Sequence, residues 1–527
     1  MKKNLLLIFA AILFAAAAQG QQRYRDSVFA SVTITTDKVY GQNYSVFTST
    51  GPNYVTPELQ PLRMDVYEPA GDTCTSRPLV IYLHEGSFAP ILYNDACVGT
   101  KSDSSIVEIC TQFAKRGYVA VSMDYRIGWN PQTPDQDTRT GTIFQAAYRS
   151  LIDAKSCVRY FKANPDTFKV DTTKIVIGGV GAGAVTALHY GALVDTNQLW
   201  LQKLISTTTN ATYGFVLGKP FVDIHRLGDL EGYGGNPAHN YANNNPGHTT
   251  NVQMIFSING VLADSDYVIP SLPPIVAMHP MTPINGTSPY QFGTVSAATF
   301  PVLFDVVGPH FYICRMDSMG LNNVINLPTM TDPYTTRANS INSGCDGLFP
   351  WITGINPFTG NTEQEDMFDW YSQAAMEFIA PFIGLTPADA DTAYAHSIKR
   401  NPNMSKTQAL AYIDTIKNYL CPRIQRALNL APGNNCSPVG IDENSKPLDN
   451  ISVYPNPAGS ELSVICYSLS GKGTIAMYNT LGEKVLEKEI MAGEKQVKLN
   501  VKNLSRGIYL VKVFTSNGSA VKKITLE

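Results

Sequence analysis

A glycine-rich turn at residues 179–183 stands where a chain could present a nucleophile. The stretch KIVIGGVGAGAVTAL, residues 174–188, predicts a buried strand, a tight turn and the start of a helix. A serine at the centre of such a strand–turn–helix unit could act as an attacking hydroxyl. The central residue here is Gly181, which has no hydroxyl, so no acyl-enzyme can form at this position.

A nucleophile of this kind needs partners of defined chemistry. A histidine must take its proton, a carboxylate must orient that histidine, and backbone N–H groups must receive the oxyanion. Two histidines, His84 and His279, each follow an apolar run that predicts a buried strand, so we expect both to face a site at the strand ends. The chain has eight histidines in all, at positions 84, 189, 225, 239, 248, 279, 310 and 396.

The elements around the turn predict a mainly parallel α/β sheet with helices on both faces. Strands and helices alternate along the chain, which is typical of that class of fold. We expect buried strands in 77–86, 118–126, 174–179, 273–279 and 301–307, and helices in 144–164, 365–380 and 405–420.

Composition divides the chain into segments. Residues 1–20 combine two lysines with an apolar run and a small-residue end, which predicts a signal peptide. We expect an α/β domain over residues 21–386, a helical extension over 387–432, a linker over 433–447 and a small all-β domain over 448–527. The Pro, Gly and Asn content of the linker marks the domain boundary.

Charge and cysteine usage exclude some classes of function. The formal net charge is −3 and only 16% of residues are charged, so nucleic acid is not an expected partner. All nine cysteines follow the signal segment, which permits disulfides, and Cys421 with Cys436 is the first expected pair. No C-x-x-C spacing occurs, and we expect neither a metal nor a cofactor.

The C-terminal segment carries four motifs in a fixed order. They are ISVYPNPAGSELSV at 451–464, MYNTLGEKV at 477–485, LSRGIYLVKV at 504–513 and KKITLE at 522–527. Together they resemble the type A C-terminal sorting domain of the type IX secretion system of Bacteroidetes. The resemblance implies a small β-sandwich, contact with that secretion machinery through residues 448–527, and passage across the outer membrane. It also implies tethering to surface lipopolysaccharide or release.

Residues 60–385 resemble a carboxylesterase-type α/β-hydrolase. The family's oxyanion stretch H-G-G-x-F appears as HEGSF at 84–88, and DYRIGW at 124–129 resembles the family's Y-R-L segment. Residues 153–179 resemble its helix and the strand leading to the nucleophile turn, and residues 264–290 follow its H-G-T-x-D segment. The resemblance implies a doubly wound, mostly parallel sheet.

The same resemblance implies that all three catalytic positions have been lost. Gly181 stands in place of the serine, and Pro283 stands where the carboxylate is expected. The histidine of the family follows the last strand, yet the chain has no histidine over residues 311–395. Asp346 lies near the place where that histidine is expected. Loss at several positions favours natural decay over a single engineered change.

The oxyanion segment is retained in part. His84, Gly86 and Ser87 match the family, while Glu85 replaces the first glycine of its pair. A carboxylate at position 85 would repel a developing oxyanion or occupy its site. The alternatives are that Glu85 points to solvent or pairs with Arg126. The pocket is expected to include these residues together with Ala182 and His279.

Two hypotheses follow. The first is an exported, non-catalytic relative of carboxylesterases that keeps its pocket for a glycan, an ester or a protein ligand. The second is a working hydrolase of carbohydrate or feruloyl esters with an unrecognised nucleophile. The absence of a serine at position 181, of a carboxylate at position 283 and of a histidine over residues 311–395 favours the non-catalytic hypothesis. Loss of even one triad member costs several orders of magnitude in rate.

Overall fold

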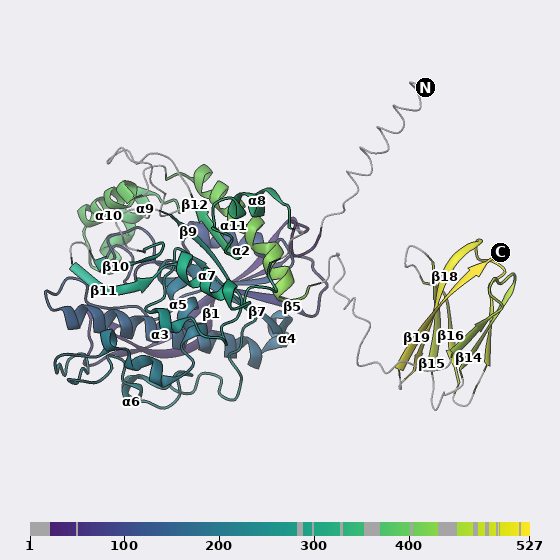
Figure 1. The fold of residues 1–527 in the computed structure, drawn as a ribbon, viewed down its shortest axis with the longest axis horizontal. Helices are drawn as coiled ribbons and strands as arrows, with labels where there is room; N and C mark the ends of the chain where they lie inside the picture. The colour runs from purple at the N-terminus through teal and green to yellow at the C-terminus, as the bar shows by residue number, and fades with distance from the viewer. Residues whose placement is uncertain are drawn as a thin grey trace, which may run out of the picture. The chain divides into compact units, whose positions relative to one another are not determined.

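The chain forms two compact units, Met1–Cys436 and Ser437–Glu527, in a computed structural model (Figure 1). The expected signal segment 1–20 and linker 433–447 lie outside the residues that the structure describes. Those residues are 22–48, 51–281, 288–297, 300–326, 330–351, 369–400, 404–430, 451–466, 473–479, 484–491, 494, 496–515 and 518–527.

An eight-stranded sheet organises the larger unit, in the order β1-β4-β6-β5-β7-β8-β9-β12. The strands from β6 to β12 are parallel to one another, while β1 and β4 add an antiparallel edge. This confirms the mainly parallel sheet predicted from the sequence. The strands are β1 (Val32–Ser45), β4 (Glu58–Pro69), β5 (Arg77–Leu83), β6 (Val119–Met123), β7 (Val170–Val180), β8 (Met254–Ile258), β9 (Ile275–Pro280) and β12 (Leu348–Trp351).

Helices cover both faces of this sheet (Figure 1). Alternate residues of β5 enter two separate cores: Leu79, Ile81 and Leu83 meet α3, α5 and α7, while Val80 and Tyr82 meet α2 and α11. This alternation is what a strand buried on both faces requires. The helices are α2 (Ser104–Ala114), α3 (Gln136–Ala163), α4 (Pro165–Phe168), α5 (Ala182–Ala192), α6 (Ile224–Leu227), α7 (Pro309–Ser318), α8 (Pro333–Asn339) and α11 (Lys406–Ala427).

Further elements surround the carboxyl ends of the parallel strands. A hairpin of β10 (Phe292–Ala297) and β11 (Phe300–Val307) forms its own two-stranded sheet. Helices α9 (Gln373–Ile379) and α10 (Pro387–Arg400) pack together in a small satellite core with Leu92 and Cys97. The remaining short elements are β2 (Phe47–Thr48), β3 (Gly51–Pro52), η1 (Thr196–Trp200), η2 (Gln202–Leu204), η3 (Ser265–Tyr267) and η5 (Ala380–Ile383).

The C-terminal unit is all-β, as the sequence predicts. A three-stranded sheet β13-β14-β17 and a four-stranded sheet β16-β15-β18-β19 enclose an apolar core that includes Leu462, Val464 and Val511. The strands are β13 (Ile451–Tyr454), β14 (Glu461–Cys466), β15 (Gly473–Tyr478), β16 (Lys484–Ile490), β17 (Gln496–Asn500), β18 (Gly507–Thr515) and β19 (Gly518–Leu526).

The cysteines differ from the pairing expected from the sequence. Cys314 of α7 is bonded to Cys345, and Cys74 is also disulfide-bonded. Cys421 lies buried in α11 as a free thiol, so the expected pair with Cys436 is wrong. Position 436 lies outside the described residues. Proximity in the sequence did not predict the pairing of Cys421, because this side chain packs in the apolar core between α11 and the sheet.

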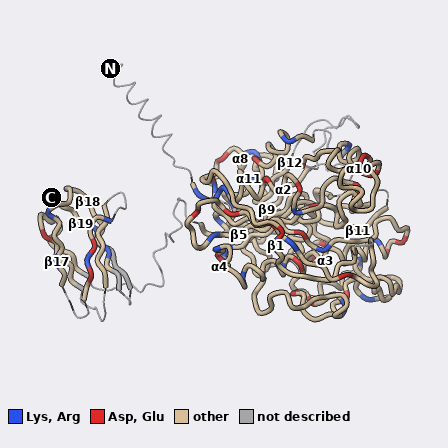
Figure 2. The backbone as a smooth tube through the Cα atoms, turned by 180° about the vertical axis from the view of Figure 1, so that it is seen from behind, with Lys and Arg blue, Asp and Glu red and all other residues tan. Residues whose placement is uncertain are grey.

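Charge is mixed over the larger unit. Figure 2 shows Lys and Arg scattered among Asp and Glu along its backbone. Within the described part of the chain, no helix is long and apolar enough to span a membrane. The same residues contain no group of three or more His, Cys, Asp or Glu side chains that could hold a metal ion.

Candidate functional site

The turn between β7 and α5 has the sharp geometry that the sequence predicts. Gly181 adopts φ +53° and ψ −118°, a left-handed conformation in which glycine is free of the steric cost of a Cβ. Its N–H donates to the carbonyl oxygen of Ile258 at 2.9 Å. The turn therefore keeps the shape of a nucleophile elbow, without a hydroxyl at its tip.

Glu85 occupies the space in front of this turn. A Cβ built on Gly181 would lie 3.1 Å from the Cβ of Glu85 and 3.6 Å from its Oε2. Glu85 follows β5 directly and is 8% exposed. The side chain of a serine at position 181 would thus lie against the Glu85 carboxylate, in the space that an acyl group on that serine would need.

Two expectations for Glu85, exposure to solvent and an ion pair with Arg126, are both wrong. Glu85 is buried. Arg126 forms an ion pair with Asp153 of α3, with 2.8 Å between Nη2 and Oδ1, and its backbone N–H donates to Oδ2 at 2.8 Å. The Arg126 side chain is therefore paired with α3 and not with Glu85.

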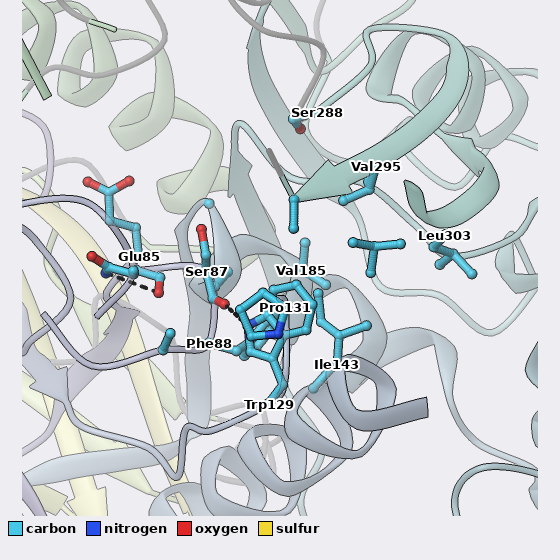
Figure 3. A pocket seen from close by; sticks show the side chains of 18 of the residues that line it. Glu85, Ser87, Phe88, Trp129, Pro131, Ile143, Val185, Ser288, Val295 and Leu303 are labelled. Carbon is cyan, nitrogen blue, oxygen red and sulfur yellow. Dashed lines mark hydrogen bonds between the residues drawn. The ribbon is translucent and has the colours of Figure 1, made fainter. Parts of the chain in front are cut away.

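The segment after Glu85 forms a tight turn that lines the site. Gly86 has φ +116°, and a Cβ added there would lie 2.7 Å from the Cα of Gly99, so the close approach requires glycine. Ser87 and Phe88 also have positive φ. Trp129 Nε1 donates to the carbonyl oxygen of Ser87 at 2.6 Å and holds the turn in place (Figure 3).

His84 lies behind this turn and does not line the cavity beside it. Its Nδ1 is 2.5 Å from the Glu85 carbonyl oxygen, and its ring stacks on Tyr125 at 4.3 Å between centroids. Burial lowers the pKa of His84, and the nearby Asp124 raises it by a smaller amount. The neutral ring is therefore a packed structural residue, in contrast to the pocket position expected for it.

His279, at the end of β9, is fully buried and contacts Ser288. Its Nδ1 lies 2.7 Å from the Pro280 carbonyl oxygen, which can only accept, so Nδ1 carries the proton. Burial lowers the pKa of His279 to about 4, so the ring is neutral at pH 7 and Nε2 is an acceptor. Ser288 Oγ lies 3.0 Å from Nε2 and 3.0 Å from the Asn259 carbonyl oxygen.

Of the two other positions at which a catalytic residue was expected, the structure describes only one. Pro283 lies outside the described residues. Asp346 precedes β12, and β12 runs parallel to β9, so Asp346 lies at the amino end of its strand. A histidine of the family is expected after the carboxyl end, so Asp346 does not mark that place.

A cavity of about 990 Å³ opens in front of the turn. Gly86, Ser87 and Ala182 line it as expected, and His84 and His279 are absent from its described lining. Aromatic and aliphatic side chains supply most of the wall, from α3, α5, the β10–β11 hairpin and the loops that follow β5 and β6: Phe88, Trp129, Ile143, Phe144, Val185, Val295, Phe300 and Leu303. Sequence patterning missed Ser288 and His189 as lining residues because neither lies in a recognisable motif.

Two buried carboxyl groups beside this site predict how stability depends on pH. Asp369 accepts from the backbone N–H and the hydroxyl of Ser105, at 3.2 and 2.9 Å. Burial raises its pKa to about 6, and burial also raises the pKa of Asp103. The folded state therefore holds these protons more tightly than the unfolded chain does, and stability is lost as pH rises.

We expect the free energy of unfolding to fall by about 3 kcal/mol as pH rises from about 4 to above 6, at roughly 1.4 kcal/mol per pKa unit for Asp369. Asp369→Asn should flatten this fall, because the amide does not titrate. Urea unfolding at pH 4.5 and 7.5, followed by tryptophan fluorescence, measures the difference. An equally steep fall in the variant would show that Asp369 is not responsible.

The doubly wound sheet, the elbow and the cavity at the strand ends define an α/β-hydrolase. Residues 64–279 match the family described as BD-FAE, and residues 452–527 match the secretion system C-terminal sorting domain. The chain therefore combines an esterase-like α/β-hydrolase domain, which we call the hydrolase domain, with a type IX sorting domain. The sorting domain engages the type IX machinery and directs export across the outer membrane, to the cell surface or beyond.

The solved structures to which the chain is similar include esterases and an α/β-hydrolase. Thermogutta terrifontis esterase 2 phosphorylated by paraoxon has 16% sequence identity and a TM-score of 0.29, and the match covers 55% of this chain and 80% of that one. MGS-M1, an α/β-hydrolase enzyme from a Medee basin deep-sea metagenome library, has 10% identity and a TM-score of 0.33, covering 76% and 100%. No curated protein matches the chain.

Proposed function

We propose that this protein is an exported binding protein that uses the cavity of an esterase-like hydrolase without turning over esters. The observation that carries the proposal is the contact between Gly181 and Glu85. The elbow has no hydroxyl, and a carboxylate lies 3.6 Å from the position of the missing Cβ. A tetrahedral oxyanion formed there would be repelled by this charge.

The sequence adds two independent losses to this contact. Pro283 replaces the expected carboxylate, and residues 311–395 contain no histidine. The cavity itself is intact, with about 990 Å³ and a mostly apolar wall, which is the form of a small-molecule site. We infer that selection has kept the cavity for binding a glycan, an ester or a protein segment.

The proposal predicts no ester turnover. The mature chain should hydrolyse short-chain p-nitrophenyl esters and feruloyl esters no faster than buffer does. Repurified protein is the control, because a second column would separate the protein from a contaminating esterase and its activity. Turnover that copurifies with the protein would contradict the proposal.

A second candidate function, ester hydrolysis, is favoured by the Ser288–His279 contact. Nε2 of a neutral His279 lies 3.0 Å from Ser288 Oγ, and the opposite ring nitrogen is fixed by the Pro280 carbonyl oxygen. The Ser288 hydroxyl, the His279 base and the Pro280 carbonyl acceptor that orients the base thus form a chain of three hydrogen-bonding groups. Ser288 lines the cavity. The hydroxyl has a competing acceptor at equal distance in the Asn259 carbonyl oxygen, which supports a purely structural role.

Ser288→Ala separates the two functions. If the protein hydrolyses esters through Ser288, this variant should lose at least ~100-fold in kcat, since the nucleophile is absent. Ser87→Ala is the matched control, because Ser87 also lines the cavity but contacts no histidine among the described residues. Equal turnover by the wild type and Ser288→Ala would eliminate Ser288 as the nucleophile.

We propose further that residues 1–20 are a cleaved signal peptide and that the exported protein is tethered to surface lipopolysaccharide or released. The sorting domain supports both steps. The N-terminal sequence and mass of protein recovered from the outer surface test them. A mature chain that begins near residue 21 and lacks the C-terminal motifs is expected.

A further inference from the structure

Three buried hydrogen-bond donors of the hydrolase domain have no acceptor in the part of the chain that the structure describes. They are Nε of Arg149 in α3, Nη1 of Arg226 in α6 and the hydroxyl of Tyr54 in the segment after β3. Arg149 is the most deeply placed, at 1% exposed. Buried donors are nearly always paired in folded proteins, so three such donors in one region need a common explanation.

Printed contacts bring the three side chains to one region. Nη2 of Arg226 donates to the carbonyl oxygen of Tyr54 at 2.8 Å. Nη2 of Arg149 donates to the carbonyl oxygen of Gly128 at 2.6 Å, and a Cβ built on Gly128 would lie 2.8 Å from Cγ2 of Val46. Val46 precedes β2, which pairs with β3 just before Tyr54. Helices α3 and α6 therefore both contact the segment that carries the Tyr54 hydroxyl.

The charged groups of this region carry a positive surplus. Asp153, one turn further along α3 than Arg149, is paired with Arg126. Among the described residues, no carboxylate forms an ion pair with Arg149. Burial lowers the pKa of Arg226, and Asp223 opposes this lowering. These three arginines therefore share two carboxylates, which leaves one positive charge without a counter-ion among the five side chains.

The neighbouring titratable groups respond to this surplus. Burial lowers the pKa of Arg149 to about 10, and Arg126 and Arg226 add to the lowering, so the guanidinium is still charged at pH 7. Burial also lowers the pKa of His239, and Arg226 and Arg149 lower it further. Burial raises the pKa of the Tyr54 hydroxyl, and Arg149 opposes that rise. Arg149 thus acts electrostatically on the same groups that Arg226 and Tyr54 contact.

We propose that Arg149, Arg226 and Tyr54 bind one small monovalent anion of the halide class. The anion accepts from the three donors and supplies the single negative charge that the region lacks. A water molecule could accept a hydrogen bond but would leave the buried charge without a counter-ion. The site goes beyond the proposed function, because none of the three residues belongs to the described lining of the cavity. The bound anion joins α3 to α6 and to the segment after β3.

Thermal unfolding of the protein that spans residues 21–527 tests the proposal. Chloride replaces gluconate, an anion too large for a buried site, at pH 7 and constant ionic strength, and tryptophan fluorescence reports unfolding. At ten times the dissociation constant, chloride should favour the folded state about tenfold and raise the midpoint by about 2–3 °C. Bromide should act in the same way.

Three variants locate the effect. Tyr54→Phe keeps the ring and removes one donor, so about tenfold more chloride should be needed for the same rise. Arg149→Met removes the buried charge and should abolish the rise. Tyr82→Phe is the matched control: it also removes a buried hydroxyl without an acceptor among the described residues, but Tyr82 packs on Phe256 in the core on the other face of the sheet. This control should respond to chloride as the wild type does.

The inference is overturned if chloride and gluconate give the same midpoint in the wild type. It is also overturned if Tyr54→Phe responds to chloride as strongly as the wild type and Tyr82→Phe do. The comparison of the two Tyr→Phe variants decides the question even if Arg149→Met does not fold. Ester turnover does not enter the measurement, so the proposed function stands or falls separately.

Discussion

Replacing Asp153 by asparagine is expected to lower the free energy of unfolding of the hydrolase domain by about 3–5 kcal/mol. Asp153 is completely buried in α3 and receives the Arg126 Nε, Nη2 and backbone N–H groups at 2.8–3.0 Å. Arg126 is 4% exposed. The substitution leaves a guanidinium in the interior without a counter-charge, and that loss is much larger than the attraction between two exposed ions.

Urea unfolding followed by tryptophan fluorescence measures this effect. All four tryptophans of the chain, at positions 129, 200, 351 and 370, belong to the hydrolase domain, so the signal reports that domain alone. Asp391→Asn is the control. Asp391 is exposed and accepts one hydrogen bond from Gln373, which an amide oxygen retains, so its change should stay within about 0.5 kcal/mol. A loss below about 1 kcal/mol in Asp153→Asn would contradict the assigned role of the pair.

Replacing Gly183 by alanine is expected to destabilise the hydrolase domain by about 3 kcal/mol or more. Gly183 lies in the first turn of α5, directly after the elbow. A Cβ there would lie 2.3 Å from the carbonyl oxygen of Leu83 and 2.5 Å from that of His84. Both are backbone atoms at the end of the central strand β5, so relief requires a shift of the sheet or of the helix.

Differential scanning calorimetry of the full chain tests this prediction. Helix propensity alone would make alanine more favourable than glycine by about 1 kcal/mol, so the sign of the change distinguishes the close approach from local preference. Gly459→Ala, in the C-terminal unit, has nothing within 4 Å of the added carbon and should leave the transition unchanged. A stabilised Gly183→Ala variant would show that α5 does not lie as close to β5 as described.

The scaffold of the site could be predicted from local sequence. The apolar run 174–179 followed by glycines predicts a strand and a tight turn because a buried parallel strand is apolar throughout and positive φ favours glycine. The same reasoning finds β5 and β6. The parallel strands bring their carboxyl ends to one edge, so His84, Glu85 and Gly181 were expected near one another.

The details of the site depend on tertiary packing, which the sequence does not encode locally. Whether Glu85 turns to solvent, to Arg126 or toward Gly181 depends on the Arg126–Asp153 pair, whose members are 27 residues apart. The position of Asp346 depends on where a four-residue strand begins. The Ser288–His279 contact joins two residues that are nine positions apart in the sequence, and no periodicity marks it.

The most direct test of the central claim is labelling of the protein that spans residues 21–527 with a fluorophosphonate, followed by mass spectrometric mapping. The probe forms a stable bond with a serine activated as a nucleophile. With Gly181 at the elbow and Glu85 in front of it, we predict that no serine is labelled above the level of heat-denatured protein. Stoichiometric labelling of Ser288, abolished in Ser288→Ala, would contradict the account and show that the cavity is a working active site.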